Sequence, residues 1–222
     1  MSAGGEPLRD TLRDNVAPRP RDARLARIVV RPLLGTWVRP NHLTALRLGV
    51  GLCGVLLLAR GGYLCSNVGM ALVVVANFLD HTDGALARMG GYVSRVGHFF
   101  DLAVDSLITV LLFVAVGYAL TSGSLGNFAL LLGFLAGLSV SAIFYLRMRI
   151  EEQDGKAGTR QPQWSGFEVE DVLYLLPLVS LFAVEAPFIV VAAIGAPVFA
   201  LWVLRDYLRV FGRRATDLSP HL

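Results

Sequence analysis

The sequence predicts an all-α polytopic membrane protein, with six transmembrane helices and an N-terminal amphipathic helix at the membrane interface. Of its 222 residues, 55% are hydrophobic and 17% are charged, and the mean hydropathy is +0.59. This composition is too apolar for a soluble domain with a polar surface. The net charge is +3 and no motif that reads DNA or RNA is present. We therefore expect the arginines to face a phosphate-rich membrane surface and not nucleic acid.

The first forty residues precede the apolar part of the chain. Residues 1–19 are rich in Gly, Pro, Asp and Arg, which predicts a disordered basic tail. Residues 20–38 predict an amphipathic juxtamembrane helix in contact with membrane lipids, because apolar residues recur at helical spacing and arginines form another face. A basic tail in solvent is the alternative. We expect no cleavable signal peptide, so the first transmembrane helix would direct insertion.

Six apolar runs follow a helix start at Pro40 and Asn41. Most approach the roughly 20 residues that a spanning helix needs, and the fifth is short. We expect a six-helix membrane domain over residues 41–206 and a cytoplasmic basic tail over residues 207–222. The predicted spans are 43–59, 67–87, 97–120, 128–146, 172–184 and 187–204.

The basic residues predict the orientation in the membrane. Eight of the 20 lie before Asn41, and the others cluster in the second and fourth connections and after the last span, with Arg47 and Arg60 as exceptions. An even number of spans with both termini in the cytoplasm satisfies the positive-inside rule. We expect an integral protein of a prokaryotic cytoplasmic membrane whose second connection, between the second and third spans, faces the cytoplasm.

Four aspartates occupy the two spans that flank this second connection. Asp80 and Asp83 end the second span, and Asp101 and Asp105 begin the third. An ionisable group at bilayer depth is costly and indicates a functional site. In an antiparallel hairpin the spacing places Asp80 opposite Asp105 and Asp83 opposite Asp101, about 10 Å below the turn. The sequence therefore predicts two facing layers of carboxylates.

These carboxylates predict a metal centre. Four clustered carboxylates need positive charge between them, which Arg88 alone does not supply. One or two hard cations, Mg²⁺ or Mn²⁺ on oxygen ligands, are the expected cofactors. A two-metal site is suited to holding a diphosphate. The small residues Gly84, Ala87 and Gly97 leave room for a substrate to approach the backbone, although the glycines could instead serve helix packing.

The pattern Asp80-x2-Asp83-Gly84-x2-Ala87-Arg88-x8-Gly97-x3-Asp101-x3-Asp105 resembles the complete signature of the CDP-alcohol phosphatidyltransferase family. Residues 40–47 resemble the family's entry to its first helix, and residues 145–151 its exit from the fourth. The resemblance implies six helices with an amphipathic N-terminal helix, and a homodimer.

The resemblance also implies a reaction and roles for its residues. A substituted phosphate would pass from a CDP-linked donor, CDP-diacylglycerol in our interpretation, to an alcohol, with release of CMP in phospholipid biosynthesis. Asp80, Asp83 and Asp101 would hold the metals, and Asp105 would share in coordination and act as general base. The nucleotide would be bordered by Gly84, Ala87, Arg88 and Gly97. Whether the lipid is the donor or the acceptor stays open.

The acceptor contacts are predicted less directly. Glu168, Glu170 and Asp171 stand where family members that use a phosphorylated polyol commonly carry basic residues. Because acidic groups repel a phosphate, this favours a neutral or cationic alcohol. Arg147 and Arg149 could instead contact an acceptor phosphate, which would favour a phosphorylated alcohol. Alternatively, they are anchors at the cytoplasmic membrane surface. The histidines that flank the acidic motif, His81 and His98, are read mainly as packing residues.

Two other functions are compatible with intramembrane carboxylates. One is a divalent-cation transporter, which would move cations without any nucleotide. The other is an inactive scaffold that keeps the fold. The small residues and the cytoplasmic location favour the enzyme over the transporter, and the unaltered acidic pattern argues against the scaffold.

Overall fold

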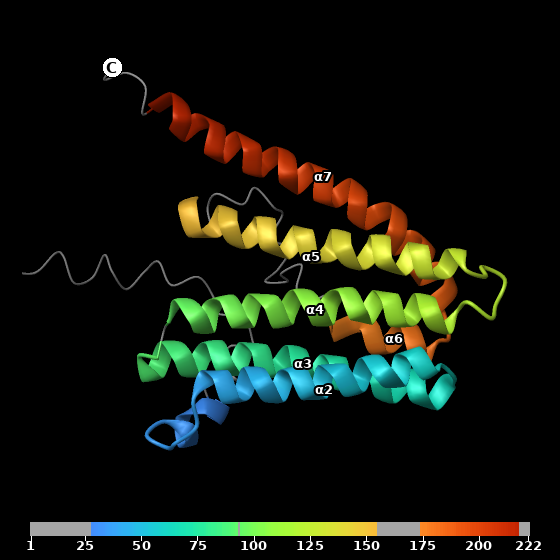
Figure 1. The fold of residues 1–222 in the computed structure, drawn as a ribbon, viewed down its shortest axis with the longest axis horizontal. Coiled ribbons are helices and arrows are strands. Elements are labelled where there is room, and N and C mark those ends of the chain that lie inside the picture. The colour runs from blue at the N-terminus through green and yellow to red at the C-terminus, as the bar shows by residue number, and fades with distance from the viewer. Residues whose placement is uncertain (1–27, 93, 155–173, 218–222) are drawn as a thin grey trace, which may run out of the picture.

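The computed structural model describes residues 28–92, 94–154 and 174–217, and every regular element in these ranges is a helix. Figure 1 shows long helices running roughly alongside one another, with α7 inclined to the rest. The elements are η1 (Arg31–Leu33), α2 (Pro40–Arg60), α3 (Tyr63–Gly90), α4 (Arg95–Ala119), α5 (Phe128–Asp154), α6 (Leu176–Leu181) and α7 (Glu185–Asp217). The predicted all-α polytopic class is confirmed.

Five helices are long and apolar enough to cross a membrane, namely α2, α3, α4, α5 and α7. They coincide with predicted spans one to four and six. The predicted fifth span, 172–184, is described from Tyr174 onward, where it forms the six-residue helix α6. That length is too short to cross a bilayer by itself. A sixth crossing is therefore a prediction that the described residues do not establish.

Helix α2 is the element that positions its neighbours, because it packs against both α3 and α4. By contrast, the described parts of α3 and α4 make few close backbone contacts with each other, although they are consecutive. The approach of α2 to α3 depends on Gly54 and Gly69. A Cβ on either would lie 2.8 Å from the carbonyl oxygen of the other, so the pair lets the two backbones meet.

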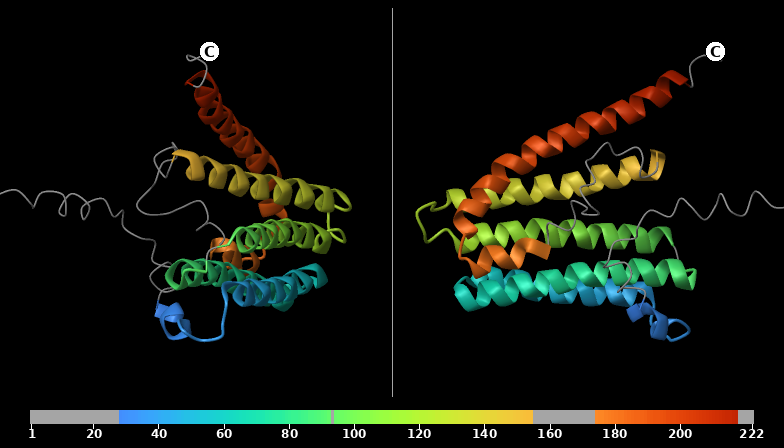
Figure 2. Two further views of the ribbon diagram at one scale, coloured as in Figure 1. Left: turned by 60° about the vertical axis from the view of Figure 1, so that its left-hand side comes forward. Right: turned by 180° about the vertical axis from the view of Figure 1, so that it is seen from behind.

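Helices α5 and α7 form the other side of the bundle, as the two views of Figure 2 show. Ile143 and Ile150 of α5 are buried with Val203 of α7, and Tyr207 and Val210 pack on the same cluster. Helix α7 continues past these contacts to Asp217. The predicted boundary at residue 206, between membrane domain and tail, therefore falls inside a continuous helix.

The predicted N-terminal segments are described only in part. The tail at residues 1–19 lies outside the described residues, as does the predicted amphipathic helix before Ile28. The described remainder is helical through η1 and then turns at Gly35, whose φ is +82°. Val30 is fully buried against Ala85 and Leu86 of α3, whereas Ile28 and Trp37 are exposed. This segment therefore packs on the last turns of α3, close to the acidic residues.

Candidate active site

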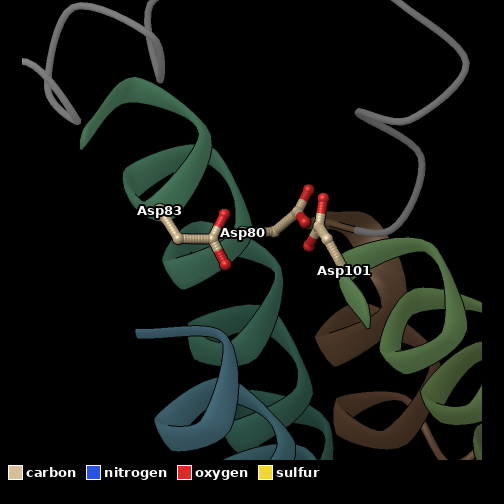
Figure 3. Close-up of side chains that lie close together, drawn as sticks. All are labelled: Asp80, Asp83 and Asp101. Carbon is tan, nitrogen blue, oxygen red and sulfur yellow. The ribbon is translucent and has the colours of Figure 1, made fainter. Parts of the chain in front are cut away.

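The acidic residues lie at one end of the bundle, where α3 ends and where α2 and α4 begin (Figure 1). Asp80 and Asp83 project from the last three turns of α3, and Asp101 from the second turn of α4 (Figure 3). One carboxylate oxygen from each of the three lies within 4.8 Å of the others. Three residues of the predicted metal set thus converge on one place.

Arg47 of α2 is the central cation of this site. Its Nη1 donates to Asp80 and, at 2.9 Å, to Asp101, and its Nη2 donates to Asp105 at 2.7 Å. The side chain is only 2% exposed. Asp83, the fourth carboxylate, accepts instead from the hydroxyl of Thr44 at 2.8 Å. Helix α2 therefore contacts all four carboxylates through two residues one turn apart.

The expectation that positive charge is needed between the carboxylates was right, but Arg47 was missed as its source. Arg88 makes no ion pair with an acidic residue among the described side chains. A signal for Arg47 was present in the sequence, since an arginine inside an apolar span indicates an intramembrane partner. One arginine still leaves the four carboxylates with three net negative charges.

In the structure, Arg47 lies between the carboxylates of the two predicted layers. Asp80 shares Arg47 Nη1 with Asp101, whereas Asp105 takes Nη2. Asp80, Asp83 and Asp101 form one group, to which Asp105 does not belong. Because α2 lies against both α3 and α4, its Arg47 reaches carboxylates of both helices.

The donor set of this group fits the predicted cofactor. Carboxylate oxygens are the ligands that Mg²⁺ and Mn²⁺ prefer. The three convergent carboxylates of Asp80, Asp83 and Asp101 could hold such an ion. Asp105, fixed by Arg47 on one oxygen, has its second oxygen available for another partner.

A pocket of about 180 Å³ opens beside the carboxylates. Its lining includes Asp83 and Asp101 and all four residues predicted to border the nucleotide, which are Gly84, Ala87, Arg88 and Gly97. It also includes residues that the sequence did not single out for this role: Pro40, Asn41, Thr44, Tyr92, Ser94 and His98. Two of the four predicted metal ligands therefore share a pocket with the predicted nucleotide contacts, whereas Asp80 and Asp105 are not part of its lining.

Local structure keeps Gly97 close to this pocket. Ser94 precedes α4, and its Oγ accepts from the Gly97 N–H at 3.0 Å, which caps the helix. A Cβ on Gly97 would lie 3.0 Å from this Oγ and 3.1 Å from Oδ1 of Asn41. The absence of a side chain at Gly97 thus lets the start of α2 approach the start of α4.

Of the remaining predicted contacts, Arg147 and Arg149 are described and neither lines this pocket. Arg147 lies on α5, and its Nε and Nη1 are buried without a hydrogen-bond partner among the described residues. Arg149 is on the same helix, and Glu168, Glu170 and Asp171 lie outside the described residues. His81 stacks on Tyr174, with ring centroids 6.5 Å apart, which agrees with a packing role, whereas His98 lines the pocket.

Known proteins resemble this chain in sequence and in fold. A family model described as CDP-alcohol phosphatidyltransferase matches residues 37–202. Archaetidylinositol phosphate synthase of Pyrococcus horikoshii is 32% identical over 102 residues, which are 45% of this chain and 52% of that protein. This match spans about half of the relative's length.

The fold resembles that of a solved structure. The crystal structure of Mycobacterium tuberculosis phosphatidylinositol phosphate synthase with CDP-DAG bound matches with a TM-score of 0.57 at 19% identity. The match covers 85% of this chain and 92% of that one. At this identity the likeness concerns the fold alone.

Proposed function

The chain belongs to the CDP-alcohol phosphatidyltransferase family, and we propose that it is a metal-dependent enzyme that transfers a phosphatidyl group from CDP-diacylglycerol to an alcohol. One observation carries this proposal. Asp83 and Asp101, which belong to the candidate metal group, line the same pocket as the small residues of the family signature. A diphosphate held at the carboxylates would place the rest of a nucleotide along that pocket.

The roles of the residues follow from their positions. Asp80, Asp83 and Asp101 would hold Mg²⁺ or Mn²⁺, which would neutralise the diphosphate and stabilise the departing CMP. Asp105 would accept the proton of the acceptor hydroxyl while the hydroxyl oxygen bonds to the phosphatidyl phosphorus and the bond from that phosphorus to CMP breaks. Arg47 fixes Asp105 by one carboxylate oxygen, and the other oxygen would take the proton of the acceptor. Arg88 would contribute positive charge at the side of the nucleotide.

We propose that the lipid is the donor substrate. The identity of the acceptor alcohol is left to experiment. The fold neighbour is described with CDP-DAG bound, which supports a CDP-linked lipid donor. Both relatives are named for inositol phosphate products, and the buried N–H groups of Arg147 suit a phosphate. The acidic residues Glu168, Glu170 and Asp171 favour an uncharged or cationic alcohol instead. Paired assays with inositol and inositol phosphate distinguish the two acceptor classes.

The test is CMP release by the purified protein in detergent. We expect CMP to form from CDP-diacylglycerol with Mg²⁺ or Mn²⁺ and an accepted alcohol, and Asp105→Asn to abolish it. Asp206→Asn, which changes an aspartate of α7 outside the site, is the matched control. Full activity of Asp105→Asn would contradict the assigned role.

A cation transporter remains the second candidate function, because intramembrane carboxylates are also its hallmark. It predicts Mg²⁺ or Mn²⁺ flux into liposomes without a nucleotide. Flux in the absence of CMP release from any CDP-alcohol would favour this function over the enzyme.

Orientation and assembly complete the proposal. We expect both termini and the pocket to face the cytoplasm and the protein to form a homodimer. Labelling of an introduced cysteine in intact cells and in opened cells tests the orientation, and the mass of the detergent-solubilised protein tests the dimer.

A further inference from the structure

The pocket has two chemically different ends. Asp83 and Asp101 lie at its inner end, and Tyr92 and Ser94, in the connection from α3 to α4, lie at its outer end. Asp83 and Gly90 are seven residues apart on one helix, which corresponds to about 10 Å along the axis. The pocket therefore extends from a group of carboxylates to an aromatic side chain at the end of the bundle.

The Tyr92 ring is held in place from two sides. The guanidinium carbon of Arg39 lies 4.3 Å from the ring centroid, in cation–π geometry. A Cβ on Gly90 would lie 2.5 Å from Cε2 and 2.6 Å from Cδ2 of Tyr92. The ring therefore occupies the space that the side chain of any residue other than glycine at position 90 would fill. The Tyr92 N–H also donates to the carbonyl of Ala87 at 2.9 Å. The ring is thus fixed before any ligand arrives.

A nucleoside diphosphate has its charge at one end and a flat base at the other. If the proposed function holds, the diphosphate lies with the metal ions at the inner end of the pocket. The base then lies toward the outer end, where Tyr92 is the largest aromatic side chain in the lining. A fixed aromatic ring contacts a base favourably and loses little conformational freedom in doing so.

We propose that Tyr92, held by Arg39 and Gly90, contacts the cytosine base of the CDP-linked donor and positions it. This inference rests on the proposed function and assigns to one side chain the recognition of the nucleobase. Arg39 and Gly90 act through Tyr92 as positioning residues. Because the base does not change during phosphoryl transfer, its contact with Tyr92 contributes equally to the bound donor and to the transition state. Its loss raises KM for the donor and leaves kcat unchanged.

The experiment compares two probes on the purified full-length protein with Mn²⁺. CDP contains the diphosphate and the base, whereas inorganic pyrophosphate contains the diphosphate alone. We expect Tyr92→Leu to weaken CDP binding about tenfold and to leave pyrophosphate binding within about twofold of the wild-type value. Tyr92→Phe, which keeps the ring, should bind both probes as the wild type does.

Two further variants test the way in which the ring is held. Gly90→Ala should displace the ring and reproduce the effect of Tyr92→Leu, and Arg39→Met should weaken CDP binding in the same direction. Tyr118→Leu, on an exposed tyrosine at the opposite end of α4, is the matched control and should bind both probes normally.

The outcomes separate this inference from the proposed function. If Tyr92→Leu binds CDP as tightly as the wild type does, the inference is overturned while the proposed function stands. If Tyr92→Leu weakens both probes equally, Tyr92 has a structural role and the inference is overturned. If the wild-type protein binds pyrophosphate but no CDP, or neither probe, the proposed function falls and the inference falls with it.

Discussion

Replacing Arg47 with methionine tests the central feature of the site. The substitution keeps much of the side-chain volume and removes the hydrogen bonds to Asp80, Asp101 and Asp105. Removing one partner of a buried ion pair costs about 3–5 kcal/mol, because the other charge stays uncompensated. The three aspartate side chains are 29–37% exposed, so water screens part of this cost. We therefore expect a loss near the lower limit, about 3 kcal/mol.

The assay is thermal unfolding in detergent, with and without Mn²⁺. For a chain of this length, a loss of about 3 kcal/mol lowers Tm by roughly 6–12 °C. Without Arg47 the carboxylates attract a cation more strongly, so Mn²⁺ should raise Tm more in Arg47→Met than in the wild type. Arg60→Met, at the exposed far end of the same helix, is the control. An unchanged Tm, or a smaller Mn²⁺ effect in Arg47→Met, would refute the reasoning.

Three more predictions concern the surroundings of the site. Thr44→Val removes the hydroxyl that donates to Asp83. Because a hydrogen bond to a charged group is worth about 1.5–3 kcal/mol, CMP release should fall at least tenfold. Thr44→Ser, which keeps the hydroxyl, should restore it. Gly54→Ala introduces a Cβ 2.8 Å from a backbone oxygen, whereas Gly49→Ala, on the same helix, meets nothing within 4 Å. Gly54→Ala should destabilise the protein by about 1–3 kcal/mol through overpacking and so lower Tm, whereas Gly49→Ala should leave Tm unchanged. Removal of divalent ions with EDTA should stop CMP release and lower Tm, and added Mn²⁺ should reverse both effects; activity that survives chelation would contradict a metal-dependent reaction.

The membrane class and most spans could be predicted because bilayer depth sets the length of an apolar run. Hydropathy placed the spans of α2, α3, α4, α5 and α7. The same criterion was weakest for residues 172–184, where the described helix α6 is short and an acidic stretch precedes the apolar residues. Charged residues beside a short apolar run weaken the hydropathy signal, so the length of this helix could not be predicted reliably from the sequence.

The site could be predicted as a set of residues but not as a geometry. The spacing of Asp80, Asp83 and Asp101 indicated a shared site, because both helices end at the same connection. The hairpin model missed Arg47 because it assumed that consecutive helices pack directly on each other. Helix α2 packs on both and brings Arg47 between them. Contacts between helices depend on tertiary packing, which the spacing of residues within one helix does not reveal.

The dependence of the site on α2 has a consequence for the order in which the protein is assembled. Helix α2 is synthesised first, so Arg47 enters the membrane before α3 and α4 can supply their carboxylates. An arginine at the centre of a lone helix costs about 2.5–3.5 kcal/mol of insertion free energy, and Arg47, the eighth of the 21 residues of α2, costs less because it lies nearer one end. Helix α2 is nonetheless apolar enough to cross a membrane with Arg47 included, so its apolar residues offset the cost of inserting the arginine. We expect α3 and α4 to pack on α2 with their aspartates paired to this cation, as in the final structure.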